Sequence, residues 1–193
     1  MIIFQVNVSD FGIDVNTINP IINSFIKENI CKKVRGENPA SITPFNLHTF
    51  NNKSIEKILD LVLDITPKIA ISNAVDRYIN DNEYENILNH TLKTKRWNPK
   101  GFHLAECWGV VYNGQQGLTP HHHFPFSLSF SYYSKADEKS SSLNICGQEI
   151  LAKEGYLTIF SAHFDHEVRP EHNMSDERIA LVGNLEYHGF TLD

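Results

Sequence analysis

The first half of the chain has the hydrophobic spacing of amphipathic helices. After Asn19-Pro20, apolar residues recur every three to four positions, which predicts a helix with proline as its first residue. The same spacing predicts a second helix over residues 54–65, with Pro67 marking its end. A third helical stretch runs from about residue 71 to 92, and an internal Asn-Asp-Asn cluster could divide it. We expect the apolar faces of these helices to pack into the core.

The second half consists of short segments rich in β-branched and aromatic residues, separated by glycine and proline. Strands at such close intervals predict an antiparallel sandwich or barrel, with the helices covering one outer face. We therefore predict a mainly β (α+β) single domain over residues 1–193, with a helix-rich part (1–96) and a β-sheet core (97–193). The predicted strands are Met1–Val6, His103–Tyr112, Phe126–Tyr133, Leu143–Ile145, Glu149–Leu151, Tyr156–Phe160 and Ile179–Tyr187.

The composition is that of an ordinary globular protein, with 193 residues of which 41% are hydrophobic and 21% charged. A net charge of -6 argues against a general nucleic-acid-binding surface, which is normally basic. The sequence has neither an apolar run long enough for a membrane span nor a signal-peptide pattern at its start. Cys31, Cys107 and Cys146 are odd in number and scattered, which fits a reducing compartment, with the cytoplasm as the default.

The candidate chemistry lies in the histidines, because five of the ten fall between residues 121 and 166 and imidazole is the commonest side-chain ligand of transition metals. Residues separated by one position on a strand point the same way, so His121 and His123 can bind one ion while His122 faces away. His166, which opens a later strand, would be the third ligand, and His163 would lie near the ligands or on the surface. Such a triple histidine could also be merely solvated.

Three protein ligands on one face of a metal ion leave its other positions open, which indicates catalysis rather than structural support. Further motifs accompany the histidines. A Trp and an Asn-Gly precede the His-x-His, a serine and a Tyr-Tyr pair follow it, and then come Glu-Gly-x-Leu-x-x-Phe, the distal histidine and an Arg-Ile ahead of an Asn. The residues are Trp108, Asn113-Gly114, His121, His123, Ser129, Tyr132-Tyr133, Glu154-Gly155, Phe160, His166, Val168, Arg178-Ile179 and Asn184.

In this order the motifs of residues 108–184 resemble the iron- and 2-oxoglutarate-dependent oxygenase superfamily, in particular a group of short bacterial and phage oxygenases. The resemblance implies a double-stranded β-helix (jelly roll) that uses O2 and binds Fe(II) through His121, His123 and His166. It also implies that Arg178, whose planar guanidinium can form two charge-assisted bonds, holds the far carboxylate of the cosubstrate 2-oxoglutarate. Asn113 is a second candidate for binding the cosubstrate, and Tyr133 is favoured over Tyr132 as the tyrosine that lines the cavity.

The chain departs from the superfamily pattern at two positions. Most relatives have Asp or Glu where His123 stands, and many have a serine where this chain has Ala180, so a tyrosine hydroxyl could replace the hydrogen bond of that serine. Asp165 and Glu167 flank His166 but should point away from its face. A surface salt bridge to Glu177 or Asp176 is the alternative role for Arg178.

Three functions therefore remain open. The first is a 2-oxoglutarate-dependent oxygenase acting on an unknown prime substrate, either a small molecule or a peptide. The second is a three-histidine cupin-type dioxygenase that does not use 2-oxoglutarate. The third is a non-catalytic jelly-roll module that binds zinc or nickel. The N-terminal helices could shape the substrate entrance or form a homodimer contact, and the sequence does not decide between these.

Overall fold

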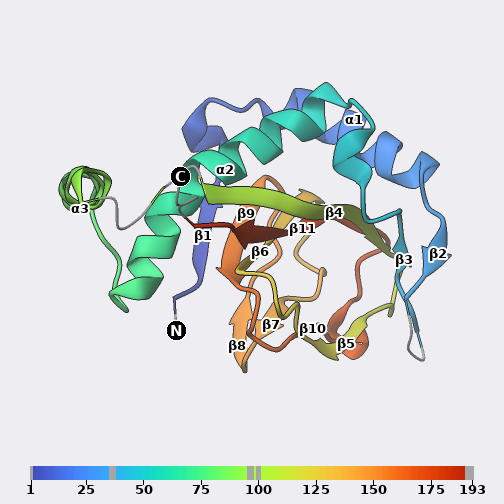
Figure 1. The fold of residues 1–193 in the computed structure, drawn as a ribbon. Helices are drawn as coiled ribbons and strands as arrows, with labels where there is room; N and C mark the ends of the chain where they lie inside the picture. The colour runs from blue at the N-terminus through green and yellow to red at the C-terminus, as the bar shows by residue number, and fades with distance from the viewer. Residues whose placement is uncertain (1, 35–37, 95–97, 99–100, 190–193) are drawn as a thin grey trace.

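The computed structural model describes residues 2–34, 38–94, 98 and 101–189. Within them, two antiparallel sheets face each other, one of seven strands and one of four (Figure 1). The larger sheet has the order β1 (Phe4–Asn7), β9 (Tyr156–Ser161), β6 (Leu128–Lys135), β11 (Arg178–Tyr187), β4 (Phe102–Tyr112), β3 (Ser41–Ile42) and β2 (Lys32–Lys33). The smaller sheet has the order β5 (Leu118–His121), β10 (His166–Val168), β7 (Leu143–Ile145) and β8 (Gln148–Ile150).

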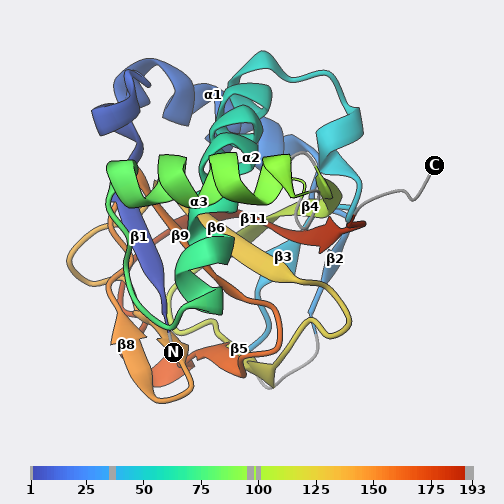
Figure 2. The same ribbon diagram turned by 60° about the vertical axis from the view of Figure 1, so that its left-hand side comes forward.

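Helices α1 (Val15–Glu28) and α2 (Lys53–Ala74) cover the outer face of the larger sheet (Figure 1). Helix α3 (Asp81–Lys93) lies outside these layers, beside α2 (Figure 2). Short 3-10 turns occur at Val8–Phe11, Leu47–Thr49 and Pro170–His172. The expected mainly antiparallel β-architecture, with helices on one outer face, is confirmed. None of the described helices is long and apolar enough to cross a membrane.

Two predicted helix boundaries are wrong, because Pro20 and Pro67 both lie inside helices. Helix α1 begins at Val15, where the Asp14 side chain accepts a hydrogen bond from the Asn16 N–H (3.1 Å). A proline inside a helix costs roughly 3 kcal/mol, whereas burying one large apolar side chain contributes about 1.5–3 kcal/mol. Each helix continues past its proline because apolar residues on both sides of it pack against the larger sheet. Tertiary packing therefore outweighs the local cost.

The third predicted helix divides at its Asn-Asp-Asn cluster. Residues 71–74 form the end of α2, and Asn80 begins α3 through a capping box, in which its side chain and that of Glu83 each accept a backbone N–H. The expected core packing holds for Ile71 and Ile79, which are buried, but fails for α3, in which no residue is buried. An ion pair between Lys68 of α2 and Asp81 helps to hold α3 against its neighbour.

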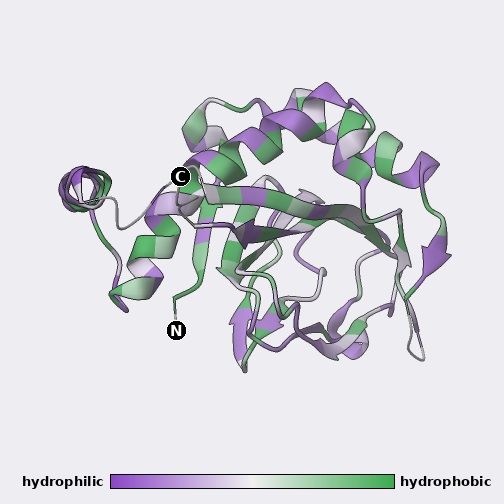
Figure 3. Ribbon diagram, in the orientation of Figure 1, coloured by the Kyte–Doolittle hydropathy of each residue, from purple (hydrophilic) through white to green (hydrophobic). Residues whose placement is uncertain are grey.

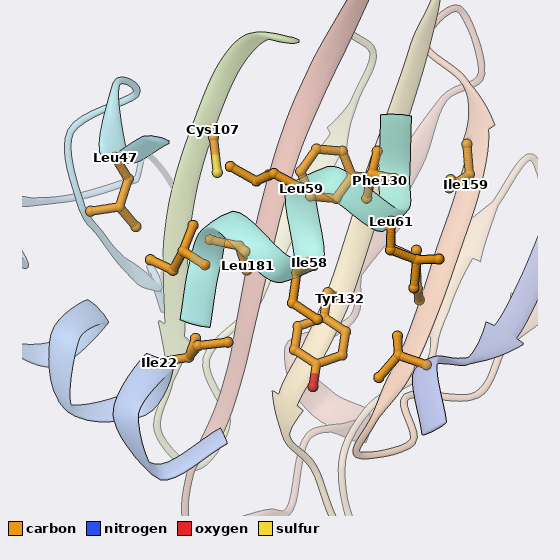
Figure 4. Close-up of a cluster of buried hydrophobic side chains, with 14 of the residues drawn as sticks. Ile22, Leu47, Ile58, Leu59, Leu61, Cys107, Phe130, Tyr132, Ile159 and Leu181 are labelled. Atoms are coloured by element: carbon orange, nitrogen blue, oxygen red, sulfur yellow. The ribbon is translucent and has the colours of Figure 1, made fainter. Parts of the chain in front are cut away.

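The main hydrophobic core fills the space between the helices and the larger sheet. Ile22 of α1 and Ile58 of α2 meet Phe130, Tyr132 and Leu181 of the central strands there (Figure 4). Hydrophobic and hydrophilic residues alternate along α1 and α2, whereas the edge strands β2 and β8 are mainly hydrophilic (Figure 3). Polar edge strands discourage pairing with other chains.

The second hydrophobic cluster lies between the two sheets, and alternation along the strands produces it. On β4, Cys107 and Val111 face the helices, whereas Trp108, Val110 and Tyr112 face the smaller sheet.

The strands β1, β2 and β3, which precede residue 96, belong to the larger sheet. The predicted boundary between residues 96 and 97 lies outside the described residues.

Candidate metal centre

Three histidines meet at one end of the space between the sheets. His121 is the last residue of β5, His123 lies in the following turn, and His166 begins β10. Strands β5 and β10 are antiparallel neighbours with His166 directly opposite His121. One ligand nitrogen from each of the three rings lies within 4.8 Å of the others. The sequence placed His121 and His123 at the start of a strand, but His121 is the last residue of β5 and His123 follows it, and both rings still point inward.

Backbone carbonyls fix the orientation of two of these rings. The Nδ1 atom of His121 lies 2.8 Å from the Thr119 carbonyl oxygen, and that of His166 lies 3.0 Å from the Phe164 carbonyl oxygen. A carbonyl oxygen can only accept, so each Nδ1 carries the proton and each Nε2 keeps its lone pair for a metal. Such outer hydrogen bonds orient metal-binding imidazoles in proteins.

Burial keeps the three imidazoles neutral. Desolvation, with smaller contributions from the neighbouring histidines, lowers the pKa of His123 to about 3. Burial lowers the pKa of His166 to about 4, and the pKa of His121 is lowered by burial as well. Metals bind the neutral form of histidine, so all three nitrogens are available near neutral pH.

The lowered pKa values predict that the metal-free protein loses stability in acid. The unfolded chain takes up protons at an ordinary histidine pKa near 6.5, whereas folded His123 and His166 do so only near 3 and 4. Stability is therefore fully present above about pH 6.5 and declines as the pH falls below it. Urea unfolding of the metal-free protein at several pH values between 7 and 4 checks this. His123→Asn should flatten the decline, and an equally steep decline in that variant would contradict the explanation.

The other polar residues around the triad point elsewhere. Glu167 accepts a hydrogen bond from Arg169 Nε (2.8 Å), and Asp165 is exposed, so neither flanking carboxylate joins the histidines, as expected. His122 is exposed and accepts the Phe124 N–H at 3.2 Å. His163 is exposed. The candidate metal-binding group among the described residues is thus three neutral histidines.

A narrow cavity extends from the triad to Arg178. Arg178 is only 1% exposed, and its guanidinium carbon lies 4.5 Å from the ring centre of Tyr112 and 5.1 Å from that of Tyr133. Its Nε and Nη1 atoms are buried without a hydrogen-bond partner. The alternative of a surface salt bridge does not hold, because Glu177 instead contacts two lysines, Lys27 at 3.1 Å and Lys135 at 2.8 Å.

The two adjacent tyrosines face opposite sides of the larger sheet. Tyr132 points toward the helices and donates a hydrogen bond to Asn19 of α1 (Figure 4). Tyr133 pairs across the strands with Ala180 and faces Arg178, and its buried hydroxyl has no hydrogen-bond partner.

Asn113 is not brought to the cavity. It is exposed beyond the end of β4, and its backbone N–H donates to Gln116 Oε1 (2.9 Å).

Tyr112 is a cavity residue that the sequence interpretation missed. It pairs directly with Arg178 across β4 and β11 and lines the cavity. Burial raises the pKa of Tyr112, while the charge of Arg178 and a hydrogen bond with it act in the opposite direction. Strand alternation could have revealed it, since Tyr112 stands four residues after Trp108 and therefore on the same face.

No family model and no curated protein match the chain. Solved structures do share its fold. A prolyl-4-hydroxylase from Pseudomonas putida aligns over 97% of this chain and 93% of its own, with a TM-score of 0.58 and 12% identity. A viral collagen prolyl hydroxylase from Paramecium Bursaria Chlorella virus-1, in complex with 2OG, aligns over 95% and 94%, with a TM-score of 0.56 and 14% identity.

A third structure with this fold is the non-heme alpha ketoglutarate dependent epimerase SnoN from nogalamycin biosynthesis. It aligns over 96% of this chain and 77% of its own, with a TM-score of 0.58 and 10% identity. At such low identity the likeness concerns the fold alone.

Proposed function

We propose that the protein is an Fe(II)- and 2-oxoglutarate-dependent oxygenase. The observation that carries this proposal is Arg178, a buried guanidinium with two unpartnered donors in a cavity that also holds three metal-binding histidines. A buried cation without a negatively charged neighbour is costly unless a ligand supplies the counter-charge. A dicarboxylate that binds the metal at one end and Arg178 at the other satisfies both requirements.

The strand connectivity supports the double-stranded β-helix that this function implies. Strands β4, β6, β9 and β11 belong to the larger sheet, and β5, β7, β8 and β10 belong to the smaller one. These eight consecutive strands alternate between the sheets except at the β7–β8 hairpin, as expected of a jelly roll. The pattern places His121 and His166 on neighbouring strands, although 44 residues lie between them in the sequence.

Five residues have defined tasks in this proposal. His121, His123 and His166 hold the iron, Arg178 binds the far carboxylate of 2-oxoglutarate, and Tyr133 donates a hydrogen bond to that carboxylate. When bound, iron and 2-oxoglutarate supply the oxidative decarboxylation that yields succinate and CO2 and oxidises a prime substrate with O2. The apolar walls formed by residues such as Leu118, Val182 and Phe160 exclude water from the site.

A three-histidine ligand set is compatible with a dianionic cosubstrate. Three neutral imidazoles leave the full +2 charge of ferrous iron uncompensated, and the -2 charge of 2-oxoglutarate would balance it. A carboxylate ligand at position 123 would have supplied part of that negative charge in advance. The histidine therefore gives no electrostatic reason to exclude 2-oxoglutarate.

Succinate formation tests the proposal directly. Protein purified without a His-tag and loaded anaerobically with Fe(II) is supplied with 2-oxoglutarate, ascorbate and O2, and succinate and O2 are measured together. We expect slow succinate formation even without a prime substrate, and none when zinc replaces iron. Absence of both succinate formation and 2-oxoglutarate binding would overturn the proposal.

A three-histidine dioxygenase that binds its substrate directly on iron is the second candidate, favoured by the absence of a carboxylate from the ligand group among the described residues. Such an enzyme would consume O2 without forming succinate. A zinc- or nickel-binding module would retain its metal tightly and consume neither 2-oxoglutarate nor O2.

Replacing Tyr133 by phenylalanine should weaken 2-oxoglutarate binding by about tenfold or more, because one hydrogen bond to a charged group contributes about 1.5–3 kcal/mol. The buried hydroxyl has no partner to lose within the described residues, so the folded protein should be no less stable. Calorimetric titration of the metal-loaded protein with 2-oxoglutarate, together with thermal unfolding, checks both effects. Tyr132→Phe is the matched control and should leave 2-oxoglutarate affinity unchanged.

A further inference from the structure

A row of three polar side chains crosses the larger sheet near the histidines. Asn184 of β11 pairs in register with Ser129 of β6 on one side and with Glu106 of β4 on the other. The Ser129 hydroxyl donates to Asn184 Oδ1 (2.8 Å), and Asn184 Nδ2 donates to Glu106 Oε2 (3.0 Å). Asn184 is fully buried, so these two bonds fix the orientation of its amide. The row begins at the cavity wall, which Ser129 lines, and ends on a carboxylate.

The register of β4 places this row beyond the metal centre, on the side opposite Arg178. Tyr112 pairs with Arg178, and Trp108 contacts the ring of His123 with 5.5 Å between ring centres. Glu106 lies two residues further in the same direction, on the same face as Trp108, and thus roughly 7 Å further along the strand. Arg178 is buried, whereas His123 and Glu106 are partly exposed. A prime substrate would therefore reach the metal past Glu106.

Glu106 places a carboxylate on this approach. Among the described residues, no cationic side chain forms a salt bridge with Glu106, and its Oε2 atom accepts a hydrogen bond from the Asn184 amide. Glu186, the next residue on the same face of β11, contacts His188 at 3.1 Å. A carboxylate without such a contact, with an aromatic ring beside it, favours a positively charged ligand.

An ammonium group already uses the aromatic surface next to this row. Lys32 Nζ lies 4.6 Å from the ring centre of Phe45, and Phe45 packs edge-on against Trp108 with 5.0 Å between ring centres. The aromatic residues at this end of the cavity are therefore compatible with a nearby cation.

We propose that Glu106 is a specificity-determining residue that selects a prime substrate bearing an ammonium or guanidinium group. Its Oε1 atom would bind the cation while Asn184 holds Oε2, and Trp108 would contact the carbon chain that leads to the metal. The inference rests on the proposed function in one respect, namely that the selected molecule is oxidised at the metal. Recognition of the cation depends on Glu106 alone and can be measured without turnover.

A binding experiment tests this inference on the zinc-loaded protein, which performs no oxidation. n-Butylammonium and its neutral analogue 1-butanol are titrated separately, and the ¹H–¹⁵N signals of the Asn184 side-chain amide and the Trp108 indole are followed. We expect n-butylammonium to bind about fivefold more tightly than 1-butanol, the effect of one partly exposed charge contact. Both signals should shift, because both groups adjoin the proposed position of the cation.

Glu106→Gln keeps an oxygen that can accept the Asn184 amide proton and removes only the charge, so the fivefold preference should disappear while the protein stays folded. Glu186→Gln changes the net charge equally, but Glu186 lies two residues beyond Asn184 along β11, and this variant should retain the preference. The inference is overturned if the two probes bind alike or not at all, if Glu106→Gln keeps the preference, or if Glu186→Gln loses it equally. If the iron-loaded protein forms no succinate, the binding result for Glu106 still stands, and the oxygenase proposal is contradicted instead.

Discussion

His166→Ala is expected to lower iron affinity at least ~10-fold and to remove nearly all turnover. Loss of a residue that merely supports a metal ligand already costs 10–100-fold in affinity or activity, and loss of the ligand itself should cost no less. The ring of His166 lies 4.3 Å from that of His121 and 5.0 Å from that of His123, centre to centre. Without it, two imidazoles remain, and these are too few to hold Fe(II) firmly on one face.

Iron content after anaerobic loading and gel filtration measures the first effect, and succinate formation measures the second. His163→Ala is the matched control, because His163 is exposed in the turn before β10, three positions ahead of His166. Its iron content should equal that of the wild type. Normal iron content in His166→Ala, with circular dichroism showing an intact fold, would show that the three histidines do not form the metal site.

Much of the β-sheet core could be predicted from sequence, because strand alternation is a local signal. Leu143–Ile145 matches its predicted bounds, and β4, β6, β8, β9 and β11 differ from theirs by one or two residues. The helices were harder to delimit. Pro20 and Pro67 suggested ends that the packing of α1 and α2 against the sheet overrides, and no local pattern contains that packing.

Part of the candidate site could also be predicted from local sequence signals. His121, His123 and His166 stood out through their spacing and through motifs, and the structure brings them together. Tyr112 and Glu106 carried no such signal, because their roles depend on cross-strand neighbours, Arg178 and Asn184, that are about 70 to 80 positions away. Asn113 belonged to a motif, yet it lies one residue past the end of β4, where its side chain is exposed rather than directed into the cavity.

Arg178→Ala should raise the concentration of 2-oxoglutarate needed for half-maximal succinate formation by about 100-fold or more, while iron content stays close to that of the wild type. Charge-assisted hydrogen bonds contribute about 1.5–3 kcal/mol each, and a guanidinium can donate two to one carboxylate. Iron content should persist because Arg178 lies at the far end of the cavity, paired with Tyr112 rather than with a histidine.

Truncating a buried side chain also leaves a void between Tyr112 and Tyr133, so two further measurements separate ligand binding from folding. Arg178→Lys retains a charge but loses the planar fork and should recover only part of the affinity. Guanidinium ion added to Arg178→Ala should lower the Michaelis constant for 2-oxoglutarate, because it can fill the void and supply the missing donors. An unchanged Michaelis constant in folded Arg178→Ala would remove the cosubstrate role of Arg178, and with it the feature that favours a 2-oxoglutarate oxygenase over a three-histidine dioxygenase.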